Sequence, residues 1–173
     1  LKYTYSLLLF ILSVSCSSSR PEIEVDCEAV DNFEYLIKWD VYPIIQGSVK
    51  IYNSSDPENF DTKGEPIAES PISDQAARVK INQNLHRQYF LVRFDDKYDI
   101  VTATRAPKLN YIQNFRDIGG YRNNHQKYIR WGMIYRAGSL DSMDYLSTKR
   151  LNLMGIRTLI DFRNLENFRT PPG

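Results

Sequence analysis

The sequence is poor in the residues that most catalytic and metal sites use. It holds 2 cysteines and 2 histidines among 173 residues, and neither histidine stands next to a cysteine. Neither charge dominates: 22 Lys and Arg face 21 Asp and Glu, for a net charge of +1. Without a strong overall field, we expect no nucleic-acid partner. We expect no metal ion and no cofactor. His86 lies in a polar stretch, which predicts an exposed loop residue rather than a metal ligand.

No apolar run is long enough to cross a membrane, but a short one near the start indicates a different kind of segment. Lys2 precedes the run LLLFIL, and small residues follow before Cys16. A cationic start, a short apolar stretch and small residues are typical of a secretory signal. The end of this run resembles the lipobox of bacterial lipoproteins, which implies cleavage before Cys16 and a lipid on its sulfur. We therefore expect residues 1–16 to be a signal peptide, and the product to be exported and membrane-anchored in a bacterial cell envelope. The alternatives are a buried first strand or helix, or an unprocessed cytoplasmic protein.

Residues 21–105 alternate between apolar and polar over short stretches, which predicts strands. Turn-rich pieces separate these stretches, so an antiparallel β-sandwich is expected. Cys27 lies in the first strand and reads as a small core residue. The expected strands are IEVDCEAV (23–30), FEYLIKWDV (33–41), GSVKIYN (47–53), ARVKI (77–81), QYFLVRF (88–94) and DIVTATR (99–105).

The pattern of this first unit resembles a fibronectin type III-like module of the immunoglobulin-like class. Trp39 ends an alternating strand, where such sandwiches bury a tryptophan. Leu85 followed by Tyr89 is similar to the tyrosine corner of that fold, in which the hydroxyl anchors a crossing loop. The resemblance implies a spacer or a binding module, and no residue here predicts catalysis.

The character of the sequence changes after Ala106-Pro107-Lys108. Two short strands are expected around Gly132, at Tyr128–Trp131 and Ile134–Arg136. A helix should follow, capped by Ser139 or Ser142, with Leu146, Leu151, Leu153 and Met154 as its apolar face and Gly155 as its left-handed stop. Ile156–Ile160 then predicts a buried strand that ends at Asp161-Phe162-Arg163. Helix, glycine and buried strand in that order predict an α/β sheet with a parallel strand. Asp141 and Asp144 should serve the start of the helix, and Trp131 should be core.

Three motifs of residues 110–173 resemble the opening part of bacterial tyrosine-phosphatase-like proteins, the protein-tyrosine/serine phosphatases with an α/β cysteine-phosphatase fold. They are NFRDIGGY (114–121), RWGMIYRAGSL (130–140) and MGIRTLIDFR (154–163). The resemblance implies that a cysteine thiolate attacks a phosphate monoester to form a cysteinyl phosphate, which water hydrolyses. That cysteine stands in a loop of pattern HCxxxxxR, whose amides and arginine hold the phosphoryl oxygens.

Neither cysteine fits that pattern. Cys16 lies in the signal, and the residue six places after Cys27 is Phe33 rather than arginine. In the family the loop follows the DFR-type strand by some tens of residues. We therefore expect a chain truncated after Gly173, inactive as given and without a catalytic residue of its own. The first residue, Leu1, also suggests a fragment.

The resemblance nevertheless implies support for a phosphate pocket. Gly119 and Gly120 would let the backbone turn tightly toward the loop, and Arg116 and Asp117 would shape the rim. Alternatively, Arg116 and Asp117 form only a local salt bridge. Three other charged residues are candidates: Arg136, or else a surface arginine, and Asp161 with Arg163, as supports rather than direct contacts.

The sequence thus leads to two functional hypotheses. The first is a phosphatase that acts on phosphotyrosine, and by extension on phosphoserine or phosphoinositides, with a phosphorylated protein or small phosphate ester as its partner. The second is a lipid-anchored β-sandwich binding protein with a vestigial phosphatase-like region.

Overall fold

The computed structural model describes residues 20–82, 85–125 and 127–163. The predicted signal peptide and Cys16 lie outside these residues.

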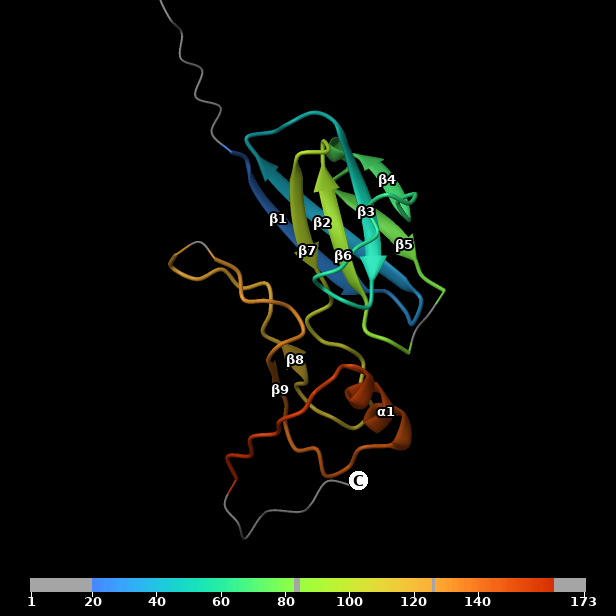
Figure 1. The fold of residues 1–173 in the computed structure, drawn as a ribbon, viewed down its shortest axis with the longest axis vertical. Helices are drawn as coiled ribbons and strands as arrows, with labels where there is room; N and C mark the ends of the chain where they lie inside the picture. The colour runs from blue at the N-terminus through green and yellow to red at the C-terminus, as the bar shows by residue number, and fades with distance from the viewer. Residues whose placement is uncertain (1–19, 83–84, 126, 164–173) are drawn as a thin grey trace, which may run out of the picture.

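Two antiparallel sheets form the upper part of the molecule in Figure 1. One contains three strands in the order β1 (Glu22–Ala29), β2 (Glu34–Tyr42) and β5 (Ala76–Lys80). The other contains four, in the order β4 (Ala68–Pro71), β3 (Ser48–Ser54), β6 (Tyr89–Phe94) and β7 (Tyr98–Thr102). All six predicted strands are confirmed within a few residues. The sequence did not predict β4, because AESP has no apolar alternation and ends in proline, and a short 3-10 helix at Ile72–Asp74 follows it.

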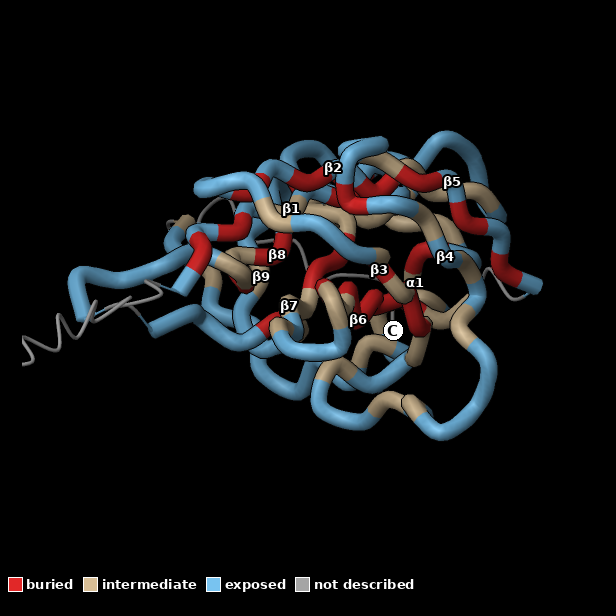
Figure 2. The backbone as a smooth tube through the Cα atoms, turned by 90° about the horizontal axis from the view of Figure 1, so that it is seen from above, coloured by how far each residue is buried: buried red, intermediate tan, exposed pale blue. Residues whose placement is uncertain are grey.

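The core lies between the two sheets, and it follows from the alternation of the strands. Buried and exposed residues alternate along β2, where Ile37, Trp39 and Val41 face inward (Figure 2). Fully burying an aliphatic or aromatic side chain of this size stabilises the fold by about 1.5–3 kcal/mol. The predicted burial of Trp39 is confirmed, and its indole Nε1 donates to the carbonyl of Ile72 at 2.8 Å. Cys27 is buried in the same core as a free thiol.

Below the sandwich in Figure 1 lies a smaller part with less regular structure. β8 (Arg116–Asp117) pairs antiparallel with β9 (Tyr135–Arg136), and α1 spans Tyr145–Leu153. Asp144 caps the helix, because its carboxylate accepts from the Ser147 amide at 2.7 Å. The prediction of Ser139 or Ser142 as the cap was therefore wrong. Gly155 ends the helix with a φ of 69°, as predicted.

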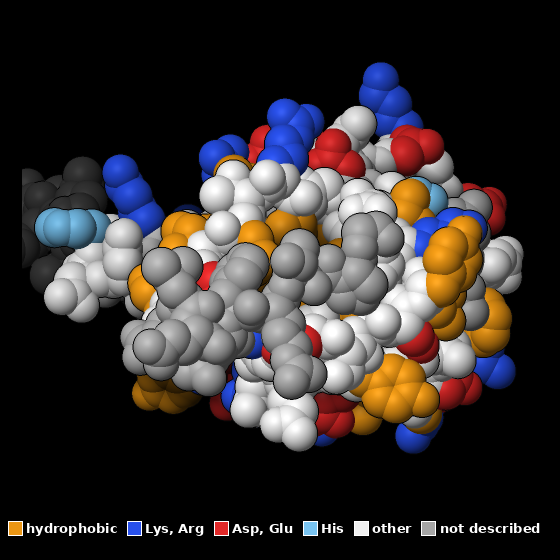
Figure 3. All heavy atoms as spheres, turned by 90° about the horizontal axis from the view of Figure 1, so that it is seen from below, with side chains coloured by type: hydrophobic (Ala, Val, Ile, Leu, Met, Phe, Trp, Pro, Cys, Tyr) orange, Lys and Arg blue, Asp and Glu red, His pale blue; other side chains and the backbone are white. Residues whose placement is uncertain are grey.

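The predicted parallel strand at Ile156–Ile160 is not formed. These residues have no regular structure, and Leu159 and Ile160 are 56% and 70% exposed. A strand needs a neighbour for its backbone groups, and the described residues offer none here, so the expected α/β sheet is not seen among them. Hydrophobic side chains accordingly lie among charged ones on the lower face of the molecule (Figure 3).

Two further predictions for this part also differ from the structure. The Tyr128–Trp131 strand is reduced to a single bridge between Arg122 and Tyr128. The expected apolar face of α1 is partly exposed, and Ser147 is the buried residue of the helix. Within the three described ranges, no helix has the length and hydrophobicity needed to span a bilayer.

Candidate functional site

Asp117 is the centre of the NFRDIGGY segment, and it is almost fully buried at 1% exposure. Its carboxylate lies 2.9 Å from Nη2 of Arg87, a residue of the sandwich. The amides of Gly119 and Gly132 donate to the same carboxylate at 2.7 and 2.8 Å. Three donors therefore hold a buried negative charge that would repel a phosphate. Asp117 ties the two parts of the molecule together, and its ion pair is with Arg87 rather than with Arg116.

Arg87 comes from the segment that leads into β6, and its side chain is 3% exposed. Its guanidinium lies 5.1 Å from the ring centre of Tyr89 and 5.3 Å from that of Tyr135. Nη2 also donates to the Thr104 carbonyl at 2.9 Å, whereas Nε and Nη1 are buried without a hydrogen-bond partner. Stacking on two aromatic faces offsets part of that cost. The cation is thus held by a carboxylate, a carbonyl and two rings.

The predicted tyrosine corner takes a different form. The Tyr89 hydroxyl lies 3.5 Å from that of Tyr135 in β9, so its hydrogen-bond partner is the second part of the molecule. Burial raises the pKa of Tyr89, which keeps the hydroxyl protonated.

Gly119 and Gly120 pack against Trp131. A Cβ on Gly119 would lie 2.5 Å from the Trp131 Cα, and a Cβ on Gly120 would overlap the indole ring. Gly120 also has a φ of 74°, which favours glycine. The tight turn expected here is therefore present, and among the described residues it approaches Trp131. The indole Nε1 in turn donates to the Val101 carbonyl at 2.9 Å.

Arg116 and Arg136 face each other as the directly paired residues of β8 and β9. Residues paired in this way place their side chains on the same side of a ladder. Both are exposed, and neither guanidinium has an ion pair or a hydrogen bond within the described part of the chain. Like charges that lie directly opposite each other on paired strands are destabilising.

Asp161 and Arg163 lie together, as their spacing predicts. Arg163 Nη2 is 2.6 Å from Asp161, and its Nη1 is 2.6 Å from Asp141, 22 residues earlier in the sequence. The hydrogen bonds from Arg163 hold the pKa of Asp161 below its usual range. Both carboxylates raise the pKa of Arg163, hydrogen bonding to Asp161 most. This cluster fastens the segment after Leu159 to the segment before α1.

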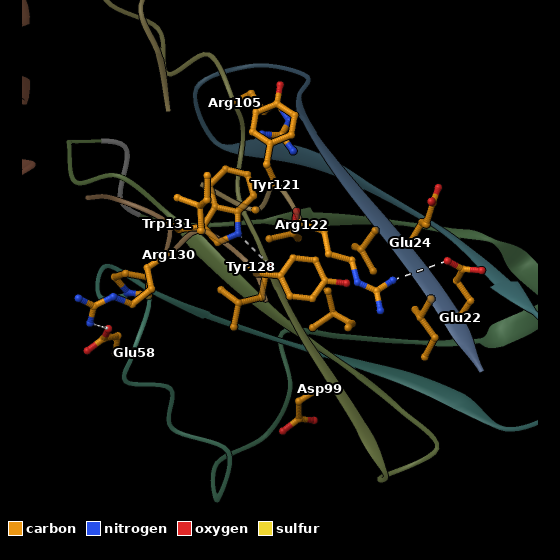
Figure 4. A pocket seen from close by; sticks show the side chains of 18 residues that line it. Glu22, Glu24, Glu58, Asp99, Arg105, Tyr121, Arg122, Tyr128, Arg130 and Trp131 are labelled. Atoms are coloured by element: carbon orange, nitrogen blue, oxygen red, sulfur yellow. Dashed lines mark hydrogen bonds and ion pairs between the residues drawn. The ribbon is translucent and has the colours of Figure 1, made fainter. Parts of the chain in front are cut away.

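Two cavities lie near these residues. The larger, of about 570 Å³, is lined by strands β1 and β7 and by residues 120–122 and 128–131 (Figure 4). The smaller, of about 290 Å³, lies between segments 55–58, 86–89, 130–133 and 153–154. Of the seven predicted site residues, all of which the structure describes, Gly120 alone lines either cavity. Among the described residues, no three His, Cys, Asp or Glu side chains are grouped so that they could hold a metal ion.

Sequence reasoning missed two arginines of this region, Arg87 and Arg105. Arg105 Nη1 donates to the Gly119 carbonyl at 2.8 Å, and its guanidinium stacks on Tyr121 at 3.9 Å. One signal in the sequence could have indicated them. HRQYF and TATRAP contain no acidic residue, so the interaction partners of both arginines must be distant in the sequence.

Comparison with known proteins agrees with the motifs of the second part. Residues 107–172 match the model of the tyrosine phosphatase family. The predicted resemblance of residues 110–173 to that family is thereby confirmed. No curated protein and no solved structure matches the chain.

Proposed function

We propose that this chain carries the opening part of a phosphatase that acts on phosphotyrosine in proteins, and on phosphoserine or phosphoinositides by the same chemistry. The match of residues 107–172 to the tyrosine phosphatase family carries this proposal. A cysteine thiolate attacks phosphorus, the bond to the substrate oxygen breaks, and the leaving oxygen takes up a proton. Water then cleaves the S–P bond, releasing phosphate and the thiolate.

The nucleophile of this reaction is not one of the two cysteines of the printed sequence. Cys27 lies in the sandwich core, and burial raises the pKa of its thiol, whereas a nucleophile needs the opposite shift. Cys16 belongs to the proposed signal peptide. We assign the nucleophile to an HCxxxxxR loop encoded after Gly173.

The residues of this chain would then position the backbone near the phosphate pocket and attract the phosphate group of the substrate. Asp117 holds the glycine turn to the segment after Trp131 through its bonds to the Gly119 and Gly132 amides. Arg116 and Arg136 are directly paired on β8 and β9, and neither has an ion pair among the described residues. Arginine binds phosphate oxygens with a planar pair of donors, so this pair is suited to receiving the dianionic group of the substrate.

The test compares the 173-residue chain with any longer chain that the complete reading frame encodes. The short chain should not hydrolyse p-nitrophenyl phosphate above a blank. The longer chain should hydrolyse it, and replacing its loop cysteine by serine should abolish turnover. Activity in the short chain, or a longer reading frame without the loop, would contradict the proposal.

The arginine pair has its own test in the longer chain. Arg116→Ala and Arg136→Ala should each raise KM for a phosphotyrosine peptide roughly tenfold, because a charged hydrogen bond is lost. Arg157→Ala, another exposed arginine, is the matched control and should leave KM unchanged. Equal effects at all three positions would remove the pair from the mechanism.

We also propose that residues 21–105 form a fibronectin type III-like module and that a lipid on Cys16 anchors the protein in the cell envelope. The three-plus-four arrangement of antiparallel strands supports the first point, and the signal-like composition of residues 1–16 supports the second. Metabolic labelling with a radioactive fatty acid should mark the protein and fail for Cys16→Ala. Labelling that survives this substitution would contradict the anchor.

A further inference from the structure

The larger cavity lies between the edges of the two sheets. β1 is one edge strand of the three-stranded sheet, and β7 is one edge strand of the four-stranded sheet. Each contributes consecutive residues to the lining, 22–25 from β1 and 99–102 from β7. Consecutive residues of a strand point to opposite faces, so the cavity follows the strand edges, over about 10 Å at the usual rise per residue. Its third wall is made by residues 120–122 and 128–131 (Figure 4).

Both strand edges turn backbone polar groups toward this space. The Val30 amide donates to Glu34, and by alternation Glu24 and Glu22 bond to β2. The N–H and C=O groups of Ile23 and Val25 therefore point away from β2.

The same alternation holds for β7. The Val101 carbonyl accepts from the Trp131 indole rather than from β6, so Val101 and Asp99 turn outward. Within the described residues, β1 pairs with β2 alone and β7 with β6 alone. Two rows of donors and acceptors thus face the cavity without a strand partner.

The aromatic side chains of the cavity each have one of the protein's own arginines near a ring face. Arg105 lies 3.9 Å from the ring centre of Tyr121 and 5.3 Å from that of Trp131. Arg122 lies 5.9 Å from the ring centre of Tyr128. A sugar or an organic cation that stacked on a ring would compete with these arginines for a ring face. The backbone edge of β1 offers a recognition surface that displaces none of these arginines.

The charge along the rim indicates what would fit those edges. Glu22 and Glu24 lie on the same, exposed face of β1, on either side of the buried Ile23. Glu24 has no ion pair within the described part of the chain, and Glu22 has one weak contact, 3.7 Å from Arg122. Basic side chains two residues apart on an added strand would lie opposite these carboxylates.

We propose that this cavity binds an extended peptide segment of a partner protein, added as a strand along β1. The peptide alternates basic residues, which face Glu22 and Glu24, with apolar residues, which enter the gap between the sheets. Main-chain hydrogen bonds to Ile23 and Val25 provide affinity, and the alternation provides specificity. This site is separate from the proposed phosphatase chemistry and does not depend on it.

The test uses the 15N-labelled 173-residue chain and an acetylated hexapeptide of alternating lysine and valine. Titration should shift the amide signals of Ile23, Val25 and Asp99. Two further peptides carry N-methyl groups on every valine or on every lysine, which removes alternate backbone donors and leaves the side chains. At least one of them should bind roughly tenfold more weakly, because only one set of amides can face β1.

Charge variants complete the test. Glu24→Lys should weaken binding of the lysine–valine peptide about tenfold by replacing an attraction with a repulsion. Glu65→Lys makes the same charge change at an exposed position outside the cavity and should have no effect. The proposal is overturned if both N-methylated peptides bind as well as the parent, or if millimolar peptide shifts none of these amides. It is equally overturned if a chitin hexasaccharide shifts these amides and the peptide does not.

Discussion

Replacing Asp117 by alanine should release the second part of the molecule from the sandwich. The substitution removes the acceptor for the Gly119 and Gly132 amides and leaves Arg87 buried without a counter-charge. Breaking a buried ion pair by removing one partner costs about 3–5 kcal/mol. Each ~1.4 kcal/mol is a factor of ten in an equilibrium constant. The population of the opened form should therefore rise by roughly 100- to 4000-fold.

Hydrogen exchange measured by NMR is the suitable assay, because it separates local opening from global unfolding. The amides of Ile118 and Gly120 donate to the carbonyls of Ile134 and Ile129 and do not touch the Asp117 carboxylate. Their exchange should accelerate by the factor above. The amide of Val92, in the centre of β6, should exchange much as in the parent protein, because the sandwich has its own core.

A double variant decides whether the buried charge is the cause. Arg87→Met together with Asp117→Leu removes both charges and fills the space, and such replacements often restore stability. We expect Arg87→Met alone to be as harmful as Asp117→Ala and the double variant to be less harmful than either. Exchange of Ile118 and Gly120 that changes less than fivefold in the single variants would refute the reasoning, as would strictly additive effects.

Three other predictions concern single residues. Gly120→Ala should lower the unfolding temperature more than Gly155→Ala, because both have a positive φ but only Gly120 would also place a Cβ on an indole ring; a calorimetric comparison showing equal losses would contradict this. The carboxyl of Asp144 has a lowered pKa, because hydrogen bonds from Ser147 and then from Asn110 stabilise its charged form. The cap should therefore stabilise α1 above about pH 4, the unfolded pKa, and be lost as pH falls through the folded pKa; an NMR titration should show this loss, and Asp144→Asn should abolish it. In a Cys16→Ala chain, Cys27 should react with a disulfide reagent at pH 8 only after unfolding in urea, because burial raises its pKa; rapid reaction of the folded chain would contradict its place in the core.

The sandwich could be predicted from sequence because the alternation of apolar and polar residues within most strands shows which face is buried. In FEYLIKWDV the inward positions are apolar and the outward positions are polar, so alternation alone located β2. β4 was not predicted, because its pairing with β3 depends on backbone hydrogen bonds, and these impose no apolar pattern on the side chains of AESP.

The second part could be predicted less well, since its structure depends on partners that are distant in sequence. Asp117 stood out by its position beside two glycines, but nothing local indicates that its counter-charge is Arg87, 30 residues earlier in another unit. Asp161 and Arg163 were found together because they are two residues apart. The apolar pattern of Ile156–Ile160 is of the kind that forms strands, but a strand also needs a neighbour, and pattern alone does not supply one.

The buried pair of Arg87 and Asp117 also limits how freely the two units could be recombined in evolution. A β-sandwich is often regarded as an interchangeable spacer, which any module of similar dimensions could replace. Here a replacement domain would need a cation that reaches Asp117 as Arg87 does, with a tyrosine ring packed against it as Tyr89 is. Without them, Asp117 beside the glycine turn would be a buried carboxylate without a counter-charge.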